Sequence, residues 1–227
     1  MHTTIVLPAI AFSVLTLAAC GGGDGGPSSD PVDARAELDA RALDAGSNVD
    51  AAPAPCTAPA SFGDAGALQA EAFFVPDVNE GTDDGVNDDL LVMFAPLDDS
   101  ATPDAIELRL FAGYGAFTGG AIRTGTFELT GAELDLLECG ICAGVITDTT
   151  PEAYADDYLP TGGTLVLTAI GTAAGQTLTG RLSNLTFQRM IIAEDGSTTP
   201  DGSCTTTLTA ATFSATLMMD PGGGKGP

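Results

Sequence analysis

The sequence predicts an all-β domain, either an antiparallel β-sandwich or a jelly-roll-like fold. After residue 60, apolar and small polar residues alternate over short segments, and helical periodicity is hard to find. Gly, Asp, Pro and Asn occupy the stretches between these segments, as the turns of an antiparallel meander require. Eight segments at this spacing are typical of a sandwich or a jelly roll.

The predicted strands follow one another from residue 68 to residue 217. In the strand over 105–113, Ile106, Leu108 and Leu110 share one face. Glu107 and Arg109 share the other face, so this strand has one buried and one solvated side. The eight strands are 68–75, 89–95, 105–113, 122–131, 142–149, 164–171, 177–192 and 204–217.

The two last strands contain a change of phase. Leu182 has an even number and Leu185 an odd one, so the apolar side chains would change faces between them. A β-bulge near Ser183 and Asn184 would restore one buried face. The final strand has a similar break, which predicts a second bulge around residues 211–212. We expect the threonine-rich faces of these strands to lie on the solvent side.

The N-terminus predicts a lipoprotein signal peptide over residues 1–19. Its apolar stretch can enter the secretion channel but is too short to span a membrane. The string LAAC, which ends at Cys20, resembles the bacterial lipoprotein pattern. This resemblance implies that Cys20 carries a diacylglycerol and an N-acyl chain such as palmitate, which anchor the protein in membrane lipid. The alternative is an ordinary secretory signal with an incidental cysteine.

Composition divides the rest of the chain into three parts. Residues 20–59 are rich in Gly, Asp, Ala, Pro and Ser, which predicts an acidic disordered tether. Residues 60–219 form the β-sandwich domain, and residues 220–227 form a flexible tail. Gly21 follows the acylated cysteine where Asp commonly marks retention in the inner membrane. We therefore expect the outer membrane or the cell surface of a Gram-negative bacterium.

Charge and missing residue types exclude several function classes. The chain has 31 acidic and 7 basic residues and a formal net charge of −24, so nucleic acid is not expected as a partner. Its single histidine, His2, lies in the signal peptide, there is no tryptophan, and the one lysine is Lys225. A Ser-His-Asp or Cys-His catalytic group and a histidine-ligated metal are therefore excluded. The kinds of functional site that remain possible are a catalytic pair of carboxylates and a calcium ion bound by oxygen atoms.

Four cysteines follow Cys20, namely Cys56, Cys139, Cys142 and Cys204. An even number in an exported chain indicates two disulfide bonds, for which three pairings exist. The favoured pairing joins the two cysteines of the CGIC motif to different partners, and a local Cys139–Cys142 bond is the main alternative. A thioredoxin-like redox function would need a helix starting at the motif, whereas the AGVIT that follows predicts a strand. Structural disulfides are thus favoured.

The chain also resembles a known group of sequences. The strings LRLFAGYGAFTGGAIRTGTFELTG, CGIC, GGTLVLT and TLTGRLSNLTF, with a late cysteine before TTLTAATFSA, are similar to predicted surface lipoproteins abundant in myxobacteria and related bacteria. The resemblance covers residues 105–217 and implies the fold and the surface location. The group has no known activity, so no catalytic residue is implied.

The segment 76–89, PDVNEGTDDGVNDD, is the candidate binding loop. Between residues 77 and 104 there are nine acidic residues and no basic one. The string TDDGVND resembles the calcium-binding turns of thrombospondin-type and dockerin-type repeats, which present oxygen atoms to one ion. The candidate calcium ligands are Asp77, Asn79, Asp83, Asn87 and Asp88. The alternative is a solvated hairpin loop, since EF-hand spacing and a closing glutamate are absent.

These observations favour a lipid-anchored lipoprotein of the cell envelope with a non-enzymatic binding or structural domain, stabilised by calcium if the acidic loop binds it. The chain is therefore not expected to be an enzyme, and its protein or polysaccharide partner is not identified. The second hypothesis is a carboxylate-dependent hydrolase of envelope or extracellular polymers, which would need a cleft with two acidic residues of raised pKa. A redox protein based on CGIC is a third hypothesis.

Overall fold

The all-β prediction is confirmed. The computed structural model describes residues 55–76 and 89–219, which all lie within the unit Ala54–Pro227. The described residues form nine strands of one sheet and two 3-10 helices. The elements are β1 (Gly63–Leu68), β2 (Glu71–Val75), β3 (Leu90–Pro96), β4 (Ala105–Phe111), η1 (Gly115–Phe117), β5 (Gly125–Glu128), η2 (Gly131–Leu134), β6 (Ile141–Ile146), β7 (Asp157–Ala169), β8 (Thr177–Ile192) and β9 (Thr198–Met219).

The sheet closes into a ring. From β2 the pairing runs through β3, β4, β6, β7 and β8 to β9, each pair antiparallel. The C-terminal end of β9 then pairs with β2 in parallel, and its middle pairs with β1 in parallel. The sheet is therefore mixed rather than wholly antiparallel. No hairpin joins β9 to β1 or β2, which lie at the other end of the chain, so no short turn dictates their relative direction.

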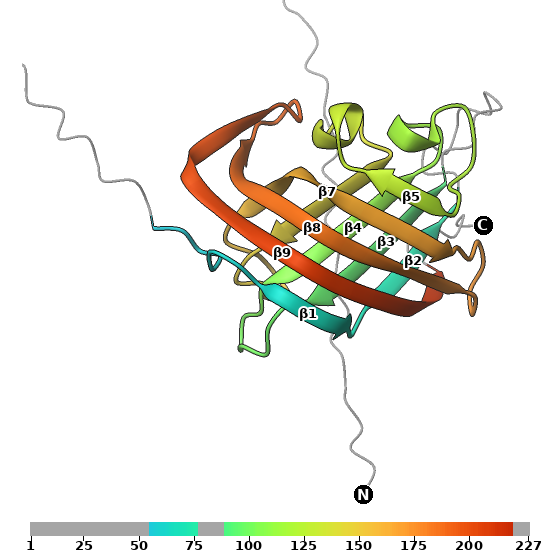
Figure 1. Cartoon of the computed structure of the whole chain (residues 1–227), viewed down its shortest axis with the longest axis horizontal. Coiled ribbons are helices and arrows are strands. Elements are labelled where there is room, and N and C mark those ends of the chain that lie inside the picture. Colours follow the sequence, from blue (N-terminus) through green and yellow to red (C-terminus); the bar gives the residue numbers. More distant parts are fainter. Residues whose placement is uncertain (1–54, 77–88, 220–227) are drawn as a thin grey trace, which may run out of the picture. The chain divides into compact units, whose positions relative to one another are not determined.

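Two layers of this sheet enclose the core, an arrangement consistent with a sandwich. Figure 1 shows β7, β8 and β9 crossing over β2, β3 and β4. Ile106, Leu108 and Leu110 are fully buried between the layers, as the alternation in the sequence predicts. The opposite layer contributes further buried side chains, including Leu165, Leu167, Leu182, Leu185, Phe187 and Leu208.

The first predicted bulge is confirmed. The register between β7 and β8 shifts where Gly162 faces Thr186 and Thr164 faces Ser183, so β8 has one extra residue. Asn184 takes that place with a φ of 51°, a left-handed conformation that Asn adopts more readily than most residues. The bulge keeps the apolar side chains on both sides of it in the core.

The second change of phase lies slightly earlier in β9 than predicted. Leu208 and Ala211 are both buried, so the apolar face changes between them and not after residue 211. The pairing with β8 is unbroken here, because Leu208 faces Leu185 and Ala210 faces Ser183. In β8 and in β9, the apolar side chains therefore change faces at the same level of the sheet. The predicted second bulge is absent from the pairing of these two strands.

Several strand boundaries differ from the prediction. The predicted strand 68–75 contains the end of β1 and all of β2, and β5 covers only Gly125–Glu128 of the predicted strand 122–131. β1 was not predicted, because the sequence GDAGAL has no β-branched residue and only Leu68 is buried. β7 and β9 each begin several residues earlier than expected, at Asp157 and Thr198. In the described part of the chain, no helix is both long and apolar enough to cross a membrane.

Candidate functional site

Most of the predicted site residues lie outside the described residues. These are the lipidation residue Cys20 and the candidate calcium ligands Asp77, Asn79, Asp83, Asn87 and Asp88. Within residues 55–76 and 89–219, no three Asp, Glu, His or Cys side chains gather closely enough to hold a metal ion. Calcium binding by the acidic loop therefore stays a prediction from the sequence.

The structure pairs the four remaining cysteines, but not in the favoured way. Cys139 is bonded to Cys142, and Cys56 is bonded to Cys204. The favoured arrangement, in which the CGIC cysteines have different partners, is wrong, and the local alternative is present. The N–H of Cys139 donates to the carbonyl of Asp135 in a turn that precedes β6. The chain continues from this turn into the motif, where the Cα atoms of the two CGIC cysteines lie 5.3 Å apart.

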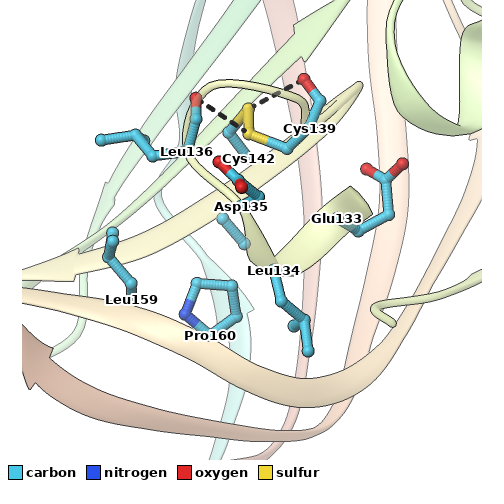
Figure 2. A pocket seen from close by; sticks show the side chains of 9 residues that line it. Glu133, Leu134, Asp135, Leu136, Cys139, Cys142, Leu159 and Pro160 are labelled. Atoms are coloured by element: carbon cyan, nitrogen blue, oxygen red, sulfur yellow. Dashed lines mark hydrogen bonds between the residues drawn. A yellow bond between two sulfur atoms is a disulfide. The ribbon is translucent and has the colours of Figure 1, made fainter. Parts of the chain in front are cut away.

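The CGIC disulfide is part of the packed interior. Cys139 and Cys142 are 5% and 8% exposed, and the strand β6 starts within the motif, as the sequence predicts. Figure 2 shows the disulfide on one side of a small cavity, with Leu159 and Pro160 of β7 on the other. The cavity measures about 10 Å³, which is room for one water molecule at most. A thiol substrate would not fit into this cavity.

Glu133 is a buried carboxylate next to this disulfide. It is 5% exposed and accepts hydrogen bonds from the N–H groups of Ala116 and Ile141, each at 2.5 Å. Burial raises the pKa of Glu133, and this effect outweighs the N–H groups of Ile141, Ala116 and Gly140, which lower it. The carboxylate connects η1 to the start of β6, so its role in this geometry is structural.

Gly140 explains why the CGIC motif contains a glycine. A Cβ atom at this position would overlap the carbonyl oxygen of Tyr114 and would lie 3.1 Å from the backbone nitrogen of Ala116. Neither backbone atom can move out of the way as a flexible side chain could. The glycine is therefore required by close backbone packing, which is a structural reason for the motif and not a redox one.

A cluster of polar side chains lies on the outer surface where β4, β6 and β7 meet. Arg109 Nη2 lies 2.9 Å from Glu107 Oε1, and its Nε donates to the same oxygen at 2.9 Å. Tyr154, which is half exposed, hydrogen bonds to Asp157. Burial and then the negative charge of Glu107 raise the pKa of Asp157, while the hydrogen bond from Tyr154 lowers it. We call these four residues the polar cluster.

The polar cluster borders a partly buried apolar surface. The outward side chains of β2, β3 and β4 form rows across the strands, in which Val92 faces Arg109 and Phe94 faces Glu107. Phe111 also makes an edge-to-face contact with the exposed ring of Tyr114, with ring centroids 6.3 Å apart. We call this surface the aromatic face; its members are Phe73, Val75, Leu90, Val92, Phe94 and Phe111.

The outer side of β7, β8 and β9 has a different chemistry. Threonines dominate it, and their hydroxyl groups bind one another across the strands, as Thr161 does with Thr186 at 2.7 Å and Thr168 with Thr179 at 2.8 Å. The expected solvation of the threonine-rich faces is therefore confirmed. We call this surface the threonine face; its exposed members are Thr161, Thr168, Thr177, Thr186, Thr205, Thr209, Thr212, Ser214 and Thr216.

The sequence is not similar to any known family at a level that would assign a function. No protein-family model, no curated protein and no solved structure matches the chain. The resemblance to predicted myxobacterial surface lipoproteins therefore stays a prediction. What the chain does has to be argued from its own residues.

Sequence reasoning did not single out Glu133 or Asp157. Glu133 stands in the run ELDLLE, where every acidic residue looks solvated, and only its approach to η1 buries it. Asp157 stands in YADDYLP, which was expected to be a loop before a later strand. In the structure, Tyr158 and Pro160 are buried and alternate with the partly exposed Asp157 and Leu159, as in a strand.

Proposed function

We propose that this chain is a lipid-anchored lipoprotein of the outer membrane or cell surface whose β domain binds a partner without catalysing a reaction. The observation that carries the proposal is the use of the five cysteines. Four are paired in two disulfide bonds, which persist in oxidising compartments outside the cytoplasm. The fifth is Cys20, at the position where the sequence resembles a lipoprotein signal.

The aromatic face is the surface that we assign to partner binding. Partly buried apolar side chains in contiguous rows are typical of protein or polysaccharide contact sites. The polar cluster at its edge supplies a carboxylate pair, a guanidinium group and a phenol for hydrogen bonds. The strong negative charge of the chain favours a neutral or cationic partner over a polyanion.

The anchor is tested by growing cells that express the full chain with an alkyne-labelled fatty acid. The expected result is label in the wild type and none in Cys20→Ser. Cys56→Ala is the matched control, since it removes a cysteine assigned to a disulfide and should keep the label. Absence of label from the wild type, or its persistence in Cys20→Ser, would contradict the lipoprotein assignment.

The binding face is tested by retention of the purified mature chain, carrying Cys20→Ser, on isolated cell envelopes. Val92→Lys places a charge in the aromatic face and is expected to abolish retention, because the lysine must be desolvated against the partner. Thr209→Lys places the same charge on the threonine face and is expected to leave retention unchanged. Equal behaviour of the two variants would refute this choice of face.

A carboxylate-dependent hydrolase is the second candidate, and one observation favours it. Asp157 has a raised pKa and is influenced by the negative charge of Glu107, as in an acid and base pair. The two carboxylates lie on the surface of the sheet and not in a cleft, so hydrolysis is a weaker proposal than binding. Slow release of reducing ends from envelope polysaccharide, lost in both Asp157→Asn and Glu107→Gln, would establish this function in place of simple binding.

A further inference from the structure

The described chain begins with a short segment, Pro55–Ala58, that is attached to distant strands. We call it the junction segment. Cys56 is bonded to Cys204 of β9, across 148 residues of sequence. The carbonyl oxygen of Pro55 accepts a hydrogen bond at 3.0 Å from Nη1 of Arg189, which belongs to β8. The segment is thus held by the two longest strands of the sheet.

Further hydrogen bonds hold the other end of the junction segment. Thr57 Oγ1 donates to Asp156 Oδ2 at 2.8 Å, and it accepts from Thr147 Oγ1 at 2.9 Å. The N–H of Ala58 lies 3.3 Å from the hydroxyl oxygen of Tyr158, a fully buried side chain of β7. These partners lie about 90 to 100 residues away in sequence, so the contacts form only in the folded domain.

Arg189 is the centre of this attachment. Its side chain is 3% exposed, its Nε lies 2.9 Å from Asp201 Oδ2, and its Nη1 lies 3.4 Å from Asp156 Oδ2. Two carboxylates therefore compensate the buried guanidinium group. Breaking an ion pair that is buried leaves a charge without a partner, which makes the loss of such a contact costly.

The strand that follows the junction segment is weakly held by comparison. Among the described strands, β1 pairs with β9 alone, and its five pairs contain two register shifts. Gly63 and Gly66 both have a φ of 65°, and Leu68 is the one buried residue of β1. A pulling force that reached β1 first would break its few pairs one after another. The junction segment precedes β1, so its contacts receive the force first.

We propose that the junction segment and its partners form a force-bearing clamp. Tension from the N-terminal anchor passes at Cys56 and Pro55 directly into β9 and β8, and β1 is not loaded. The disulfide bond carries the tension covalently, and the contacts of Arg189 and Thr57 support it. This inference rests on the proposed function, because only an anchored surface protein is pulled through its N-terminal segment.

The experiment is single-molecule pulling on the mature chain, residues 20–227 with Cys20→Ser, held by handles at its two ends. The disulfide encloses the chain between Cys56 and Cys204, which are separated by 148 positions in sequence, and this loop should not extend under oxidising conditions. The variant Cys56→Ala with Cys204→Ala should release the loop and lengthen the unfolded chain by about 530 Å, at about 3.6 Å per residue. The variant Cys139→Ala with Cys142→Ala is the matched control and should keep the short extension.

The non-covalent part of the clamp is tested in the Cys56→Ala, Cys204→Ala background. Adding Arg189→Gln is expected to speed unfolding at a fixed force about 10- to 100-fold, because charge-assisted hydrogen bonds are lost. Thr57→Val keeps the side-chain volume, removes the bond to Asp156 and should give a smaller acceleration in the same direction. This second variant decides the result if Arg189→Gln fails to fold.

Each outcome bears on the clamp. Full extension of the oxidised wild type would show that Cys56 and Cys204 are not bonded to each other, so that no disulfide carries the load. Unchanged unfolding in Thr57→Val and Arg189→Gln would show that the junction contacts do not resist force. Either result overturns the proposal. The handle replaces the lipid, so the experiment stays decisive for the clamp even if fatty-acid labelling refutes the anchor at Cys20.

Discussion

Removing the two disulfide bonds separately should have very unequal effects on stability. Both bonds have similar Cα–Cα distances, 5.4 Å for Cys56–Cys204 and 5.3 Å for Cys139–Cys142. They differ in the length of chain that they close, which spans 148 residues in the first bond and 3 in the second. A disulfide stabilises the folded state mainly by restricting the unfolded chain, and this effect grows with loop length.

Loop length gives the expected magnitudes. The chain-entropy relation assigns about 5 kcal/mol to the long loop and about 2 kcal/mol to the short one. For a domain of this size, about 1 kcal/mol changes the melting temperature by about 2–4 °C. Alanine in place of both cysteines should therefore lower the melting temperature by about 10–20 °C for Cys56–Cys204 and by about 4–8 °C for Cys139–Cys142.

The assay is thermal unfolding of the mature chain under oxidising conditions, followed by circular dichroism, with both double variants measured beside the wild type. The comparison separates loop closure from packing, because the CGIC cysteines are both buried whereas Cys56 is exposed. Lost packing alone would make the CGIC variant the less stable of the two. Equal losses, or a larger loss in the CGIC variant, would refute the assignment of the stabilisation to loop closure.

Three further predictions follow from the structure and the sequence. Gly140→Ala should destabilise the domain by about 1–3 kcal/mol or more in thermal unfolding, because its Cβ would overlap the backbone of Tyr114. Gly120→Ala, which meets no atom within 4 Å, should be neutral or slightly stabilising, and equal effects would contradict this account. Burial raises the pKa of three carboxyl groups, those of Asp104, Glu133 and Asp157. A raised folded-state pKa means that the folded domain binds more protons at these groups than the unfolded chain, so they should raise the melting temperature as the pH falls from neutral towards the ordinary pKa range of carboxyl groups. The lowered pKa values of the exposed Asp98 and Asp195 act in the opposite direction only at lower pH, within and below that range. A fall in melting temperature between neutral pH and the start of that range would contradict this prediction. Millimolar calcium should raise the melting temperature of the wild type and not of Asp83→Ala, and no shift in the wild type would leave the acidic loop as solvated charge.

The strand faces could be predicted because they depend on local alternation. Ile106, Leu108 and Leu110 are buried as their spacing indicates, and the bulge at Asn184 follows from the change of phase along β8. β1 could not be predicted in this way. Its sequence has little strand propensity, and it is a strand only because β9 offers backbone partners along it.

Some residues of the candidate site could likewise be predicted from the sequence, and others could not. The cysteines and the outward placement of Glu107 and Arg109 were visible in the sequence. The burial of Glu133 and the position of Asp157 beside Glu107 were not visible, because both depend on contacts between segments far apart in the chain.

The sequence by itself determined the all-β class, most strand positions, the acidic charge and the number of cysteines available for disulfide bonds. These properties follow from composition and from the period of the side chains along each strand, which are local. Only the tertiary structure decided the disulfide partners, the closure of the sheet by parallel pairing of β9 with β2, and the separation of an aromatic face from a threonine face. Those outcomes depend on which distant segments meet when the core is buried, and alternation along one strand does not specify its neighbour.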